Sequence, residues 1–223
     1  MKKVLAIVRK DIVTELRTKE LFTSMLTFSL LVIVIFNFAF QFSTELVRLA
    51  APAMLWITFT FAGVLGLSRS FALEKEGNAV LGLLLTPTDR SLIYFGKMIS
   101  NTLFVFVVGM VIVPMFVLFF NYSFVDTLVP LIPVIFLGSL GFVSVGTLFS
   151  AMAINTRLRE VLLPILLFPI IIPLIVSAVK LSGQVLEGES IAGASSALQL
   201  LVAFDIIFIA ACAVVFEYVI EES

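Results

Sequence analysis

Residues 69–97, RSFALEKEGNAVLGLLLTPTDRSLIYFGK, form the one long stretch that is not plainly soluble in lipid. Seven charged side chains fall in it, and the sequence on either side is apolar enough to cross a bilayer. Residues 71–85 have a helix-compatible pattern, and Thr86-Pro87-Thr88-Asp89 then breaks it, because proline restricts its neighbour and lacks an N–H. A helix can restart at residues 91–100. We expect a short amphipathic helix on the membrane surface that receives a push from a soluble partner; a solvated loop is the alternative.

The composition indicates the class of protein before any motif does. Of the 223 residues 61% are hydrophobic, and the mean hydropathy is +1.21, far above the values of soluble domains. The chain has no histidine and one cysteine, Cys212. An intrachain disulfide is therefore excluded, as are the commonest metal ligand and haem ligand. We expect an all-α polytopic membrane protein with no metal site.

Residues 1–20 form an amphipathic segment. Its apolar face consists of Val4, Leu5, Val8, Ile12, Val13 and Leu16, and its polar face of Lys3, Lys10, Thr14 and Arg17. The basic side chains suit anionic headgroups, so the pattern predicts an interfacial helix on the cytoplasmic leaflet. A cleaved signal peptide fits less well, because the charged region contains acidic residues and no small-residue cleavage site follows it.

Six apolar stretches are each long enough to cross about 30 Å of hydrocarbon as a helix. They run at about residues 21–42, 52–68, 98–120, 129–154, 161–179 and 197–217. Six spans place both termini on one side, with outer loops at residues 43–50 and 180–196 and a short turn at 121–128. Small residues at four-residue spacing allow close helix packing, either within the chain or between copies: Ala62, Gly66 and Ser70, and Gly146 and Ser150.

The basic residues predict the orientation. Twelve of the 14 Lys and Arg residues lie in the N-terminal segment, in residues 69–97 or in the turn at 155–160. The exceptions are Arg48 and Lys180. By the positive-inside rule, both termini and residues 69–97 are expected in the cytoplasm, where soluble ATPases are found.

The sequence contains no enzyme motif. A phosphate-binding G-x-x-x-x-G-K-[ST] loop is absent, since Gly96-Lys97 is followed by Met98. H-E-x-x-H, a Cys/His cluster and a nucleophile with a histidine base are absent too. Nothing indicates a nucleic-acid partner. We therefore expect a non-enzymatic membrane protein whose energy, if it needs any, comes from another chain.

Ionisable residues and prolines inside the spans are candidate functional residues. Asp205 lies about a third of the way into the sixth span. It is either a functional carboxyl or, the interpretation we favour, one that snorkels or hydrogen-bonds between helices near the outer surface. Three prolines bend the fifth span and free backbone carbonyls, as a gating element or a static kink would require: Pro164, Pro169 and Pro173.

Two groups of residues follow the order and spacing of a known family. The first is Arg48-Leu-Ala-Ala-Pro52 with Trp56, then Gly77, the leucines up to Pro87, and Gly96-Lys97. The second is Leu137-Gly138-x-x-Gly141-x4-Gly146, then Arg157 and LLPILLFPIIIP at residues 162–173. Together they make residues 45–180 resemble the heme exporter B family, also called cytochrome c maturation protein B. One position departs from the family pattern, because Ser68 stands where an acidic residue often precedes the arginine.

The resemblance implies a permease subunit of an ABC-type transporter in cytochrome c biogenesis, with the six-span ABC-2-type fold, in the bacterial plasma (inner) membrane. Its partners would be a CcmA-like ATPase that binds the ATP, a CcmC-like haem-handling subunit and a CcmE-like haem chaperone. Haem would be the cargo of the complex, exported, transferred or released with the chaperone. This chain offers only methionine, tyrosine or Cys212 as conventional haem ligands, so we expect it to bind no cofactor alone.

Residues 69–97 would then be the coupling segment. The residues expected to contact the ATPase are Phe71, Glu74, Lys75, Glu76, Gly77, Leu81, Leu84, Pro87, Arg90 and Lys97. ABC ATPases work in pairs and this chain supplies one coupling segment, so two copies of the chain are expected. Two other functions stay open: an ABC-2-type exporter permease for another lipid-like or polymer cargo, and a structural membrane subunit that transports nothing.

Overall fold

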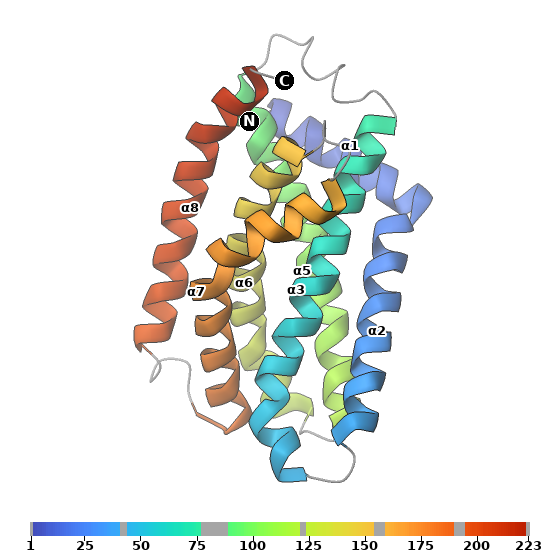
Figure 1. Ribbon diagram of the computed structural model, residues 1–223, viewed down its shortest axis with the longest axis vertical. Coiled ribbons are helices and arrows are strands. Elements are labelled where there is room, and N and C mark those ends of the chain that lie inside the picture. Colours follow the sequence, from blue (N-terminus) through green and yellow to red (C-terminus); the bar gives the residue numbers. More distant parts are fainter. Residues whose placement is uncertain are drawn as a thin grey trace.

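The computed structural model describes residues 2–40, 44–76, 89–120, 124–153, 159–189 and 195–221. Within these ranges the chain forms helices and no strand (Figure 1). The helices are α1 (Lys2–Thr18), α2 (Glu20–Phe40), α3 (Thr44–Glu76), α5 (Arg90–Phe120), α6 (Phe124–Ala153), α7 (Arg159–Leu186) and α8 (Ser195–Glu221).

Six of the described helices contain a stretch that is long and apolar enough to cross a membrane. These stretches are Glu20–Phe40, Glu45–Ala72, Arg90–Phe120, Leu128–Ala153, Val161–Leu186 and Ser196–Val219. The predicted class, an all-α polytopic membrane protein with six spans, is confirmed.

The helices extend beyond the predicted apolar stretches. α3 begins at Thr44, within the stretch predicted as an outer loop, and α6 begins at Phe124, within the predicted turn. α7 continues through Lys180 to Leu186, where a polar linker was expected. Hydropathy marks the part of a helix that lipid can surround, whereas the helix itself ends only where the backbone hydrogen bonds end.

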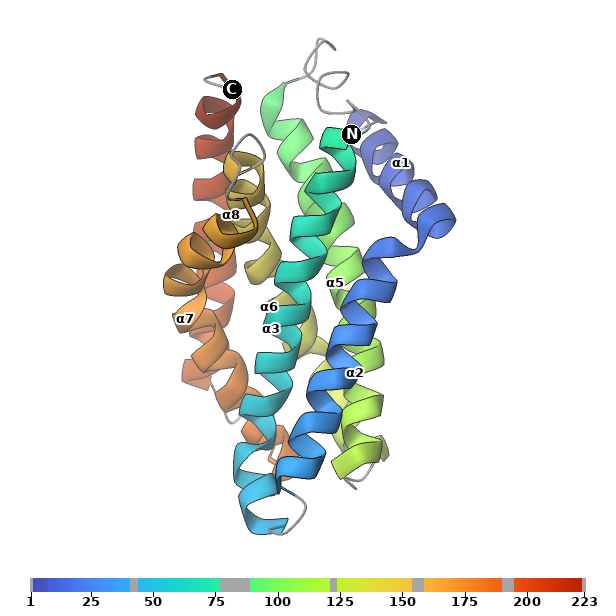
Figure 2. The same ribbon diagram turned by 45° about the vertical axis from the view of Figure 1, so that its right-hand side comes forward.

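The six long helices run along the long axis of the molecule, and α1 lies across one end of them (Figures 1 and 2). That end also carries both termini, the end of α3 and the start of α5. We call it the coupling end. Both termini therefore lie on the same side of the bundle as the end of α3 and the start of α5, as an even number of spans requires.

Glycines on α6 allow its neighbours to approach closely. The indole of Trp56 on α3 occupies the place where a Cβ at Gly138 would be. The indole Nε1–H also donates to Ser182 Oγ on α7, at 2.8 Å. This contact joins α3, α6 and α7, and it brings together Trp56 and Gly138, one from each of the two sequence groups described above.

The small-residue faces of α3 and α6 are used inside the chain. Gly66 gives room to Met25 of α2, and Gly146 gives room to Leu67 of α3. Ser70 donates a hydrogen bond to Asn101 of α5. These faces pack the bundle, so they do not form a surface for a second copy.

Candidate functional site

Charged and polar side chains from four helices gather at the coupling end. We call this group the polar belt and define it as Asp11 and Glu15 of α1, Glu20 of α2, Arg69 and Ser70 of α3, and Lys97 and Asn101 of α5. Its contacts join neighbouring helices or hold the turn between α1 and α2. They lie near the end of α3 and the start of α5.

The first contact fixes α1 to α5. Lys97 is 2% exposed, and its Nζ lies 2.9 Å from Oδ2 of Asp11. Lys10 approaches the other carboxylate oxygen, with 3.0 Å between Nζ and Oδ1. Next to this pair Ile7 rests on Gly96, where an added Cβ would lie 2.9 Å from Ile7 Cγ2. α1 therefore packs against α5 at Gly96 and Lys97.

The second contact fixes the turn between α1 and α2. Lys19, the one residue between these helices, has a φ of 57°, and its N–H donates to the carbonyl of Glu15 at 2.7 Å. Glu15 Oε1 accepts the N–H of Phe22 at 3.0 Å, so the side chain satisfies a free donor at the start of α2. Burial raises the pKa of Glu15, although the backbone N–H groups of Phe22 and Leu21 partly oppose this rise.

The third contact joins α2, α3 and α5. The guanidinium of Arg69 donates to Oε2 of Glu20, and Ser70 Oγ donates to Asn101 Oδ1 at 2.8 Å. Ser68 replaced the acidic neighbour that the family pattern suggested for this arginine. The structure supplies an acidic partner from α2 instead, which the local sequence could not reveal.

A fourth contact ties the start of α5 to the end of α8. Arg90 Nη1 donates to the backbone carbonyl of Glu217, at 3.4 Å. Together with the polar belt, it means that the helices on both sides of residues 77–88 are held to their neighbours. α3 is tied to α2 and α5, and α5 is tied to α1 and α8.

The structure separates the predicted coupling residues into three groups. Phe71 and Lys97 are buried, so neither offers a surface to a partner, contrary to the expectation that they contact one. Glu74, Lys75 and Glu76 lie in the last turns of α3, and Arg90 opens α5. The remaining four lie outside the described residues: Gly77, Leu81, Leu84 and Pro87.

The face of α1 that packs on the bundle is distinct from the apolar face expected to meet the membrane. Ile7, Asp11 and Glu15, spaced by four residues, face the bundle. Leu5 and Leu16 stay 69% and 64% exposed. Hydropathy alone did not show that Asp11 and Glu15 would be buried. Their burial depends on the partners Lys97 and Phe22, which the pattern within α1 does not indicate. The four-residue spacing from Ile7 was the available signal.

Asp205 of α8 lies inside the bundle, not at its surface. It is 3% exposed, and neither carboxyl oxygen has a hydrogen-bond partner among the described residues. Its Oδ1 lies against Gly141 of α6, in the place where a Cβ would be. The favoured expectation, a snorkelling or interhelically hydrogen-bonded carboxyl, is therefore wrong. Only a glycine at position 141 leaves room for the carboxyl of Asp205.

The three prolines all lie within α7 (Pro164, Pro169 and Pro173). Pro164 faces a cavity between α2, α3 and α7. The backbone carbonyl of Pro173 accepts a hydrogen bond from Ser177 Oγ, at 2.9 Å. Among the described residues, no group of three or more His, Cys, Asp or Glu side chains could hold a metal ion.

A comparison with protein families identifies the chain. The family model described as CcmB protein matches residues 2–221, so the chain belongs to the CcmB family, the heme exporter protein B family. The predicted family is confirmed. A search of curated proteins found no match.

Membership of the family establishes the general function. The chain is a multi-pass membrane protein and the permease component of a haem exporter in cytochrome c maturation. It is a membrane subunit and not an enzyme, and it associates with other cytochrome c maturation proteins, such as an ATPase.

Proposed function

We propose that this chain is the membrane subunit through which a CcmA-like ATPase drives export, transfer or chaperone-bound release of haem. The ATPase docks within residues 69–97, on the part between Glu74 and Arg90, and binds and hydrolyses the ATP. The observation that supports this proposal is the anchoring of the helices on both sides of residues 77–88. A segment whose flanking helices are held to different neighbours transmits a push, whereas a loosely attached segment absorbs it.

The anchors define which helices move with the segment. α3 pulls on α2 through Arg69 and Glu20, and α5 pulls on α1 through Lys97 and Asp11. Arg90 adds the end of α8. A push on residues 77–88 therefore reaches α1, α2 and α8 together with α3 and α5, and the Trp56 contact passes it on to α6 and α7.

The docking surface consists of the turn that ends α3, the segment that follows, and the start of α5. It includes Glu74, Lys75, Glu76, Gly77, Leu81, Leu84, Pro87 and Arg90. Lys97 acts behind this surface by holding α1. CcmC-like and CcmE-like partners hold the haem, because this chain has no histidine and binds no cofactor by itself.

The coupling end faces the cytoplasm of a bacterium with the chain in the plasma (inner) membrane. The observation that supports this orientation is the gathering of basic residues at that end, where α1 alone contains Lys2, Lys3, Arg9, Lys10 and Arg17. A pair of ATPase subunits needs two docking surfaces, and a second copy of this chain supplies the other one. Native mass spectrometry of the ATPase-bound complex checks the copy number. A single copy beside a different permease chain would overturn that part of the proposal.

Replacing Glu74, Lys75 and Glu76 by alanine tests the docking site. The variant should insert into the membrane normally but retain less ATPase when it is purified from cells that contain both subunits. The matched control replaces Glu187 and Glu189, which are exposed at the opposite end of the bundle. Full retention of the ATPase by the triple variant, with unchanged ATPase activity, would refute the docking site.

A further inference from the structure

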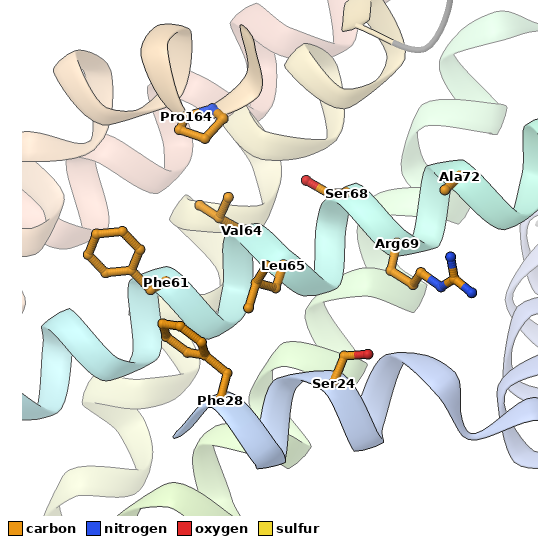
Figure 3. Close-up of a pocket in the computed structure, with 9 residues that line it drawn as sticks. All are labelled: Ser24, Phe28, Phe61, Val64, Leu65, Ser68, Arg69, Ala72 and Pro164. Carbon is orange, nitrogen blue, oxygen red and sulfur yellow. The ribbon is translucent and has the colours of Figure 1, made fainter. Parts of the chain in front are cut away.

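A cavity of about 410 Å³ opens between α2, α3 and α7, close to the coupling end (Figure 3). One end of it is polar, with Ser24, Ser68 and Arg69. The side chain of Ser68 points into the space between α3 and α7, toward Pro164. The polar end lies at the level where the spans of α2 and α3 begin and end, since Glu20 opens one span and Arg69 lies three residues before the end of the other.

The other end of the cavity is apolar. It is lined by Phe28, Phe61 and Leu65, which lie farther along α2 and α3 from the polar end (Figure 3). The ring centroids of Phe28 and Phe61 are 6.3 Å apart, and those of Phe61 and Phe168 are 5.6 Å apart. These rings come from α2, α3 and α7 and form an apolar surface at this end of the cavity, which suits a hydrocarbon chain.

The cavity opens sideways, toward the bilayer. Phe61 is 44% exposed and Leu65 is 40% exposed, and both lie within the span Glu45–Ala72. A molecule that enters from this side comes from the lipid. It must also match the cavity, with a polar group at the membrane surface and an apolar chain below it.

The charges at the polar end specify the headgroup. Arg69 is paired with Glu20, so the site carries one positive and one negative group side by side and no net charge. Arg69 and Ser24 line the cavity, and Glu20 lies one helical turn before Ser24 on α2, where Ser24 Oγ donates to its backbone carbonyl at 2.7 Å. A guanidinium has five N–H donors and a carboxylate has about four acceptor sites, so the pair leaves both donors and acceptors for a ligand.

We propose that the cavity binds one phospholipid whose headgroup carries both a phosphate and a primary ammonium, of the phosphatidylethanolamine type. The phosphate lies against Arg69, the ammonium lies against Glu20, and one acyl chain extends toward Phe28 and Phe61. A phosphatidylglycerol headgroup would add the negative charge of its phosphate beside Glu20, and it has no ammonium to balance that charge. A choline headgroup has no N–H to donate. This site does not depend on how the ATPase docks.

Competition among lipids tests the site. The full chain is reconstituted in vesicles that contain equal amounts of phosphatidylethanolamine, phosphatidylglycerol and phosphatidylcholine, and is then extracted in mild detergent. Native mass spectrometry identifies the lipid that stays bound. We expect one phosphatidylethanolamine per chain, enriched about five- to tenfold over the other two, as one charge-assisted hydrogen bond at a half-exposed site would produce.

Two variants separate the roles of the charges. Glu20→Gln leaves Arg69 unpaired and should shift the preference to phosphatidylglycerol. Arg69→Gln should abolish retention of all three lipids. The matched controls are Glu45→Gln and Arg48→Gln, which change the exposed acid and base at the opposite end of α3 and should keep the wild-type preference.

A third variant keeps the ion pair intact. Ser68→Phe fills the cavity and should lose the bound phosphatidylethanolamine, and an unchanged melting temperature shows that the bundle still folds. If the charge variants do not fold, Ser68→Phe alone tests whether the cavity holds the lipid. The site is overturned by a wild-type chain without preference for phosphatidylethanolamine, by an unchanged preference in Glu20→Gln, by full retention in Ser68→Phe, or by haem bound there, which a Soret band would show.

Discussion

Lys97 of α5 and Asp11 of α1 form a buried ion pair across 86 positions of sequence, with 2.9 Å between Nζ and Oδ2. Removing one member of such a pair leaves the other charge buried without its partner, which is costly in a low-dielectric interior. The attachment of α1 to the bundle therefore depends on both side chains.

Replacing Lys97 by methionine should lower the free energy of unfolding by about 3 kcal/mol, the lower end of the range for buried pairs, because Lys10 still approaches Asp11. Adding Asp11→Asn should recover part of the loss, since the uncompensated charge is then gone. Unfolding in detergent measures both effects, and protease sensitivity of α1 shows whether the helix has detached. Lys2→Met, which changes an exposed lysine of α1, is the control. Equal stability of Lys97→Met and Lys2→Met would contradict the prediction.

Glu15 should make the stability depend on pH. Burial raises its pKa in the folded state above the ordinary value of 4.5, so the folded protein binds this proton more tightly than the unfolded chain does. The resulting stabilisation is present below that value and is lost as the pH rises through the folded-state pKa. Glu15→Gln should remove this decline and be more stable than wild type at neutral pH, because its amide oxygen can still accept the N–H of Phe22.

Denaturation curves across the acidic range measure this effect. Glu45→Gln, at an exposed position, should leave the wild-type pH profile unchanged. A wild-type stability that rises with pH over the same range, with the slope removed in Glu15→Gln, would show that the sign is wrong.

Gly141 and Asp205 should behave as a coupled pair. Gly141→Ala places a methyl group where Asp205 Oδ1 lies, so it should cost about 1–3 kcal/mol, as overpacking does. In an Asp205→Ala background the same change should cost little, because the carboxyl that it displaces is gone. Gly183→Ala is the control, since its nearest contact would be an ordinary 3.5 Å to Pro52 Cγ. Additive effects in the double variant would refute the coupling.

Cysteine labelling tests the orientation. In a Cys212→Ala background, a cysteine introduced at Gly188 should react with an impermeant reagent added from outside, and one at Gly77 should not. Gly188 is exposed in the turn directly after α7, and α7 ends opposite the coupling end (Figure 1). The reverse pattern would invert the topology, and labelling at both sites would show that the number of spans is wrong.

The features that the sequence predicted are those that depend on local pattern. Apolar stretches of sufficient length revealed the six spans, and their even number placed the termini together. The amphipathic character of residues 2–18 and the restart of a helix after Pro87 were visible for the same reason.

The candidate site was only partly predictable, because its key contacts join residues far apart in sequence. Nothing near Lys97 indicates that Asp11 buries it, so it was assigned to the docking surface. Nothing near Arg69 indicates that Glu20 is its partner. Asp205 also looked peripheral, since its burial depends on a glycine of another helix.

The single residue between α1 and α2 limits how α1 can move. Lys19 holds a left-handed backbone conformation, and one residue adds only about 3.8 Å of chain between the two helices. α1 therefore has no slack to slide along the membrane surface. Because Asp11 and Ile7 also hold α1 against α5, a displacement of α5 at Lys97 is passed through α1 to the start of α2.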